Sequence, residues 1–221
     1  VAGFGFGLMS VPLMSLVIDI HSAVIVSSIV AVFANGVQTY LFRSHRDRPL
    51  ARRLSLASIT GLPVGYVIFE LVSDRSLRIA LGVGVVVAVA MLSRGLNLAH
   101  LGPRIDWSLG FVSGVLNTSI STSGPPLVFD LQARRLAPEA FRATINCVFL
   151  VSGCVGLAIF AIGGKIQFDE LRAGAAAAPS LALGLAVGLP LRRRFSPERF
   201  RTLVMVLLVA GAVAAVLKAF V

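Results

Sequence analysis

Long apolar segments separated by short polar connections dominate this chain. About 20 apolar residues in helical form cross a hydrocarbon core of ~30 Å. Six uninterrupted segments approach or exceed that length, at residues 21–42, 54–72, 77–93, 140–163, 173–191 and 200–220. Two further apolar segments, residues 1–18 and 107–131, are interrupted by glycine, proline or hydroxyl residues. The pattern predicts an all-α polytopic membrane protein in which these two segments are broken or re-entrant helices.

Composition agrees with a membrane environment and removes several other classes. Of 221 residues, 57% are hydrophobic and 14% are charged, whereas soluble domains carry roughly 25% charged residues. Two cysteines and three histidines argue against a disulfide framework or a multi-ligand metal site, so we expect no metal and no cofactor. The net charge of +10 comes from short arginine clusters between apolar segments. We therefore expect contact with membrane lipid and none with nucleic acid.

The basic residues of the connections distinguish two topologies, because Lys and Arg collect on the cytoplasmic side. If every apolar segment crosses once, nine Lys and Arg fall inside and ten fall outside. If residues 107–131 instead enter from the cytoplasm and return, connections 43–53, 94–106, 132–142 and 192–201 all lie inside. The count then becomes fifteen inside and four outside. The charge bias favours the re-entrant topology.

The same order of segments occurs twice along the chain, which predicts two inverted repeats at residues 1–98 and 99–221. Each begins with a broken segment and continues with three spans, and an odd number of crossings inverts the second repeat. Because the chain starts at Val1 in an already apolar segment, we expect that part of the first repeat is missing. In transporters built from inverted repeats, matching interruptions point to the binding site.

The two interruptions align on proline, Pro12 in the first and Pro125-Pro126 in the second. Proline suits the first turn of a helix, so each break should start a half-helix inside the membrane. The free N–H groups and positive dipole end of such a helix attract anions. The residues that we expect to bind substrate are Gly5, Gly7, Pro12, Asn35, Asn117, Ser121, Thr122, Ser123, Gly124, Pro125, Pro126 and Asn146.

A structural reading of these residues stays open beside the functional one. The glycines and prolines are also ordinary packing and turn residues, and Asn35 and Asn146 also suit hydrogen bonds between helices. Asp130 follows the second break and either accepts a proton in coupling or pairs with Arg134. The glycine pairs 61/65, 110/114 and 184/188 have the spacing of close helix contacts.

Two stretches carry a resemblance to a known family. They are the glycine-rich opening, residues 2–7, which leads to Val11-Pro12-Leu13, and the segment Thr122-Ser123-Gly124-Pro125-Pro126-Leu127-Val128. With these motifs and the spacing of its spans, the chain resembles the sulfite exporter TauE/SafE family of bacterial membrane proteins. The resemblance implies export of sulfite, sulfoacetate or a related organosulfonate across the bacterial inner membrane.

We therefore expect a multi-pass secondary transporter of a small sulfur-containing anion, and no enzymatic activity. The sequence contains no Gly-rich loop ending in Gly-Lys-Ser or Gly-Lys-Thr, so the signature of a nucleotide-driven pump is missing. The alternative is a channel or carrier for another small ion, including a metal cation. An intramembrane enzyme fits less well, because no histidine lies within a predicted span beside a catalytic partner.

Overall fold

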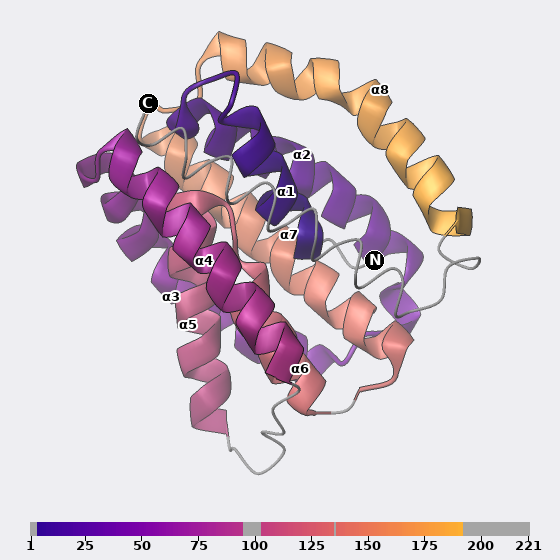
Figure 1. Cartoon of the computed structure of the whole chain (residues 1–221). Helices are drawn as coiled ribbons and strands as arrows, with labels where there is room; N and C mark the ends of the chain where they lie inside the picture. The colour runs from indigo at the N-terminus through magenta and orange to yellow at the C-terminus, as the bar shows by residue number, and fades with distance from the viewer. Residues whose placement is uncertain (1–3, 95–102, 135, 192–221) are drawn as a thin grey trace.

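The computed structural model describes residues 4–94, 103–134 and 136–191, and within these ranges every regular element is a helix. Figure 1 shows the helices stacked as a bundle, with α8 crossing its outer side obliquely. The helices are α1 (Phe4–Met14), α2 (Ile20–Leu41), η1 (Arg43–His45), α3 (Arg48–Leu71), α4 (Asp74–Arg94), α5 (Pro103–Ile120), α6 (Gly124–Ala133), α7 (Pro138–Ile162) and α8 (Phe168–Leu191).

Three of these helices, α2, α3 and α7, are long and apolar enough to cross a membrane. They coincide with the predicted spans 21–42, 54–72 and 140–163. The predicted spans 77–93 and 173–191 also fall on helices, α4 and α8. The predicted span 200–220 lies outside the described residues. The described part of the chain is thus all-helical, with three helices of membrane-spanning length and apolarity.

Residues 107–131 form the predicted hairpin, in which α5 enters the bundle and α6 returns to the same end. Asp106, in the first turn of α5, pairs with Arg134 just after α6, so both ends of the hairpin lie at the same end of the bundle. Asp106 also pairs with Arg53 near the start of α3, with 2.6 Å between Arg53 Nη1 and Asp106 Oδ2. At the same end His45 pairs with Glu139, the second residue of α7, at 3.0 Å.

A second set of polar contacts lies at the opposite end of the bundle. Lys165 Nζ is 2.7 Å from Glu70 Oε1, and His21 Nδ1 is 2.9 Å from Asp74 Oδ1. Arg78, near the start of α4, donates to the carbonyl of Ser15 at 2.7 Å. The described basic connections therefore separate between the two ends as the charge count predicted. The fourth inner connection, residues 192–201, lies outside the described residues.

The helices α3 and α5 pack so closely that their backbones touch. Each of Gly61, Gly65, Gly110 and Gly114 faces the other helix, and an added Cβ would collide with it, at three of the four with backbone. These two glycine pairs confirm the predicted close contact. For the third predicted pair, no atom of the described residues lies within 4 Å of a Cβ built at Gly184 in α8, so this contact is not seen in the described part of the chain.

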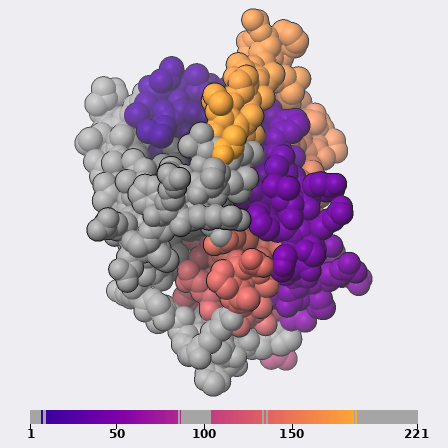
Figure 2. Space-filling view, turned by 90° about the vertical axis from the view of Figure 1, so that its right-hand side faces the viewer, coloured from indigo at the N-terminus to yellow at the C-terminus, as the bar shows by residue number. Residues whose placement is uncertain are grey.

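Two apolar clusters fill the bundle on either side of the α5–α6 break. The outer cluster joins α1, α2, α3, α4, α5 and α7 through buried residues that include Val11, Ile20, Phe69, Leu77, Ile120 and Phe160. The inner cluster packs α6 against α3 and α7 through residues that include Leu54, Leu127, Leu131, Ile145 and Phe149. Outside these two clusters, α8 packs beside α2, and Figure 2 shows α8 in orange next to α2 in purple.

The first helix differs from its prediction. Pro12 was expected to start a half-helix, but α1 begins at Phe4 and continues through Pro12 to Met14. Proline is tolerated inside membrane helices where neighbouring groups satisfy the freed backbone. The missing N–H of Pro12 leaves the carbonyl of Leu8 without its usual helical donor, and the Ser15 hydroxyl donates to the carbonyl of Pro12 itself, at the end of α1, at 2.9 Å. The alignment of Pro12 with Pro125-Pro126 as equivalent helix starts is therefore wrong.

Candidate functional site

The break between α5 and α6 consists of Ser121, Thr122 and Ser123. Ser121 has φ = 53°, in the left-handed region that costs a non-glycine residue roughly 1 kcal/mol or more. The amide of Thr122 then donates back to the carbonyl of Leu116 at 3.0 Å. The hydroxyl of Ser113 donates to the carbonyl of Ser123 at 2.7 Å. Hydrogen bonds on both sides thus hold the unwound backbone in one conformation.

Helix α6 starts directly after the break, at Gly124, with both prolines in its first turn. This confirms the predicted half-helix start in the second half of the chain. The first four N–H groups of a helix have no intrahelical acceptor, and Pro125 and Pro126 have no N–H group to offer. The Ser123 side chain makes no capping hydrogen bond. The positive end of α6 is therefore presented by the amides of Ser123 and Gly124.

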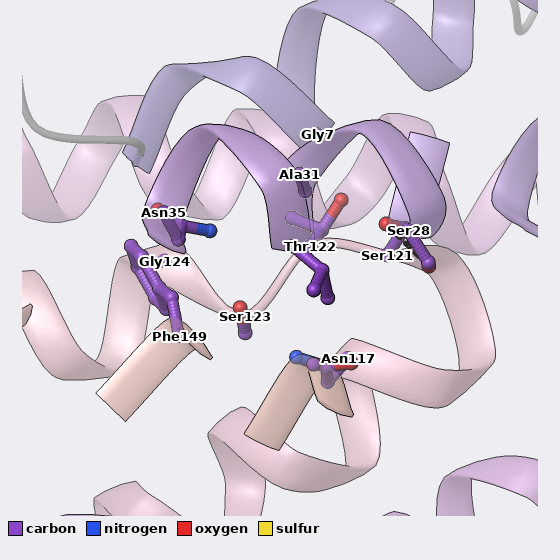
Figure 3. Close-up of a pocket in the computed structure, with 12 residues that line it drawn as sticks. Gly7, Ser28, Ala31, Asn35, Asn117, Ser121, Thr122, Ser123, Gly124 and Phe149 are labelled. Atoms are coloured by element: carbon purple, nitrogen blue, oxygen red, sulfur yellow. Dashed lines mark hydrogen bonds between the residues drawn. The ribbon is translucent and has the colours of Figure 1, made fainter. Parts of the chain in front are cut away.

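A pocket surrounds this helix start. It contains about 440 Å³ of space, including the part that opens to the surface. Figure 3 shows the break running through its centre, with side chains reaching it from neighbouring helices. The described lining residues are Gly7, Ser28, Ala31, Val32, Asn35, Asn117, Ser121, Thr122, Ser123, Gly124, Phe149 and Gly153. Because Ala31 and Phe149 lie at the middle of α2 and α7, the pocket lies near the middle of the bundle.

Two asparagines reach the break from opposite sides, Asn35 of α2 and Asn117 of α5 (Figure 3). Asn35 is only 4% exposed, and its Oδ1 has no hydrogen-bond partner in the described part of the chain. An amide oxygen only accepts hydrogen bonds, so the group of Asn35 that can donate to an anion is Nδ2, which Figure 3 shows pointing toward the break. Asn117 Nδ2 makes one long hydrogen bond, 3.4 Å, to Ser152 Oγ.

Serine residues connect α2 to the break. The Ser28 hydroxyl donates to the carbonyl of Val24 at 2.7 Å. Because a hydroxyl has one hydrogen, the 3.1 Å contact between the hydroxyls of Ser28 and Ser121 is donated by Ser121. Gly7 of α1 touches the break from another side, since an added Cβ there would collide with the carbonyl of Ser121.

The pocket brings together seven of the residues that the sequence predicted: Gly7, Asn35, Asn117, Ser121, Thr122, Ser123 and Gly124. Pro125 and Pro126 are buried in the first turn of α6 and shape the pocket without lining it. Gly5 lies in α1, two residues before Gly7. Pro12 is buried in the last turn of α1.

Asn146 also lies away from the pocket. It is fully buried, and its Nδ2 is 3.4 Å from Gln38 Oε1, which joins α7 to α2. This contact fits the interhelical reading of Asn146 rather than a ligand contact. The face of α7 that lines the pocket starts one turn later, at Phe149 and Gly153.

Five lining residues were not predicted from the sequence: Ser28, Ala31, Val32, Phe149 and Gly153. Ser28 had a usable signal, because it lies seven residues before Asn35 and so shares its helix face. The others have apolar side chains or none, which is typical of helix packing. Their role depends on which face of each helix meets the break, and a single sequence does not specify that.

Asp130 lies at the inner end of the hairpin rather than in the pocket. It is 4% exposed, and its Oδ1 is 3.5 Å from Arg134 Nε. Its Oδ2 has no hydrogen-bond partner among the described residues. Arg134 also holds Asp106, so the two aspartates share one arginine.

The chemistry of the pocket follows from its donors. Every described lining residue is uncharged, so positive potential comes from the α6 helix end and from amide and hydroxyl dipoles. Such a site favours a small anion. Among the described residues, no group of three or more His, Cys, Asp or Glu side chains is placed to hold a metal ion.

Comparison with known proteins adds the family. The chain is 30% identical over 154 residues to a Cupriavidus necator protein named "Probable sulfite/organosulfonate exporter TauE", covering 66% of this chain. The matched region is 59% of that relative. No solved structure matches the chain significantly. The family of sulfite exporters TauE/SafE matches residues 1–215 of the 221. The chain therefore belongs to the sulfite exporter TauE/SafE family.

Proposed function

We propose that this protein is a secondary transporter that exports a small sulfur-containing anion across a bacterial inner membrane as a multi-pass protein. The anionic group binds at the amides of Ser123 and Gly124, where α6 begins. Family membership and the name of the C. necator relative support the substrate class. We further propose that residues 1–98 and 99–221 are inverted repeats that alternate around this site.

The single observation that carries the proposal is the polar environment of the α6 helix start. Asn35 places a buried side-chain amide, whose Nδ2 can donate, beside a helix start at which the N–H groups of Ser123 and Gly124 have no intrahelical acceptor. Each hydrogen bond to a charged group contributes about 1.5–3 kcal/mol. No described arginine or lysine lines the pocket, and the absence of a fixed cation keeps binding weak enough for release.

The membrane potential is the simplest energy source for this export. Moving one negative charge outward from a negative interior gains about 2.3 kcal/mol per 100 mV. Because the described lining residues are uncharged, the substrate carries its own charge across. Asp130 is the buried carboxylate placed to add a proton to this cycle. In vesicles, replacement Asp130→Asn should leave the response to membrane potential intact and remove any response to a pH gradient.

Efflux from proteoliposomes tests the proposal. Vesicles loaded with sulfite, sulfoacetate or a divalent metal salt are given an inside-negative potential, and the release of each solute is followed. We expect release of the sulfur anions, faster at larger potential, and no release of the metal. Release of the metal alone would support the alternative of a cation carrier or channel.

A pair of amide variants links the activity to the pocket. Asn35→Leu removes a pocket amide and should lower the apparent affinity for sulfite at least tenfold, the equivalent of about 1.4 kcal/mol. The matched control is Gln38→Leu, since Gln38 is also buried in α2 but bonds Asn146 instead of lining the pocket. It should change the affinity less than twofold. If the two changes lower the affinity for sulfite equally, Asn35 is not part of the binding site.

The two prolines provide a second test. Pro125→Ala together with Pro126→Ala adds two N–H groups and allows the helix to extend back into the break. We expect transport to fall more than tenfold while the protein still inserts into the membrane. Unchanged transport would show that the position of the helix start is unimportant.

A further inference from the structure

We propose that Phe149 and Gly153 of α7 form a subsite for the uncharged part of the substrate and so determine which anions are exported. This inference rests on the proposed function and deepens it. The substrate class that fits is an organic anion with a short carbon chain, bound more tightly than a bare inorganic oxyanion.

The first argument is the asymmetry of the two central helices. Helix α2 lines the pocket with Ala31 and Asn35, which lie eleven and fifteen residues after its first residue, Ile20. Helix α7 lines it with Phe149 and Gly153, which likewise lie eleven and fifteen residues after its first residue, Pro138. Equivalent positions thus carry a small residue and an amide on one side, and an aromatic ring and a glycine on the other.

That difference has a chemical consequence. An oxyanion such as sulfite has polar oxygens around its sulfur and gains from donors on all sides. In this pocket the α2 wall offers the amide of Asn35, while the α7 wall offers a ring and the bare backbone of Gly153. A ligand with a polar head and an apolar body matches both walls, whereas a bare oxyanion leaves the apolar wall without a partner.

The second argument is the position of the ring. Phe149 is 5% exposed and belongs to the inner apolar cluster, so its position is fixed by packing. In Figure 3 it lies beside Gly124, where the anionic head is placed. A carbon chain attached to a head at Gly124 therefore lies along Phe149.

Gly153 limits how long a carbon chain the pocket accepts. A Cβ built at Gly153 would lie 2.7 Å from Cγ2 of Val32, which is closer than carbon atoms approach without strain. Val32 lines the same pocket from α2. The Val32 side chain thus already fills the place beside Gly153, and an alanine at this position would displace this pocket-lining side chain.

Calorimetric titration of the purified full chain tests the subsite with sulfite and with methane-, ethane-, propane- and butanesulfonate. These ligands share an anionic sulfur group and differ in the carbon chain. Burial of each methylene contributes about 0.8 kcal/mol, so affinity should rise about fourfold per carbon until the space is filled. All sulfonates should bind more tightly than sulfite.

Two variants assign the effect to α7. Phe149→Leu should reduce the gain to less than twofold per carbon. Gly153→Ala should move the tightest binding to a shorter chain. Phe141→Ala is the matched control, because Phe141 lies on α7 and packs against the inner cluster without lining the pocket. It should preserve the wild-type series.

The outcomes separate the subsite from the proposed function. If sulfite and all sulfonates bind with equal affinity, or if neither α7 variant changes the series, the subsite is refuted while an anion site stands. If no sulfur anion binds to the folded wild-type protein, both the subsite and the proposed function are refuted. Thermal unfolding of each variant checks that the compared proteins are folded.

Discussion

Replacing Asp106 by asparagine should strongly destabilise the inner end of the bundle. Asp106 has a fully buried side chain between Arg53 and Arg134, whose side chains are 35% and 30% exposed. Removing one partner of a fully buried ion pair costs about 3–5 kcal/mol. Since water reaches both arginines and moderates this cost, we expect Asp106→Asn to lower the free energy of unfolding by about 2–3 kcal/mol.

Thermal unfolding in detergent measures this loss. For a chain of this length 1 kcal/mol shifts Tm by about 2–4 °C, so Asp106→Asn should lower Tm by about 4–12 °C. Glu139→Gln is the control, because it removes an ion pair at the same end whose side chains are 50% and 63% exposed. Exposed pairs contribute about 0–1 kcal/mol. If the two variants unfold within 1 °C of each other, the buried pairs do not hold the hairpin.

Three further predictions concern packing, binding and pH. Gly114→Ala should lower the free energy of unfolding by at least 2 kcal/mol, since its Cβ would collide with the α3 backbone. Gly184→Ala, where a Cβ meets no described atom within 4 Å, should change this free energy by less than about 0.5 kcal/mol. Chemical denaturation measures both changes. Ser123→Ala should weaken sulfite binding about five- to tenfold in titration calorimetry, with Tm unchanged within 2 °C. Asp19 caps α2 by accepting from the Ser22 amide at 2.8 Å. Partial burial raises the pKa of Asp19, but hydrogen bonds from Ser22 outweigh it and hold the pKa below its ordinary value. Asp19→Ala should therefore cost about 1 kcal/mol at neutral pH, and denaturation at several pH values should show this cost disappearing as pH falls through the lowered pKa.

The second half of the site was predictable because its signals are local. A pair of prolines after three hydroxyl residues fixes where a helix begins, since proline cannot donate inside a helix and is tolerated in its first turn. The return of the hairpin to the same end followed from arginine positions, because charges avoid the membrane interior. Both inferences needed no knowledge of neighbouring helices.

The first half of the chain and the α7 face that lines the pocket were less predictable. Pro12 satisfies the same local rule as Pro125 and yet lies in the last turn of α1, so the local rule alone does not tell a helix start from a helix end. Asn146 and Phe149 are three residues apart on α7, and only the rotation of the packed helix decides which of them lines the pocket. That rotation comes from tertiary packing, which a single sequence does not contain.

The most direct test is to locate a bound anion in the protein. We would determine a crystal structure with bromomethanesulfonate, whose bromine gives an anomalous signal and whose sulfonate marks the head. The account predicts sulfonate oxygens about 2.7–3.2 Å from the amides of Ser123 and Gly124, with the bromine against Phe149. A sulfonate seated on Arg53 and Arg134, with the α6 helix start left free, would contradict it.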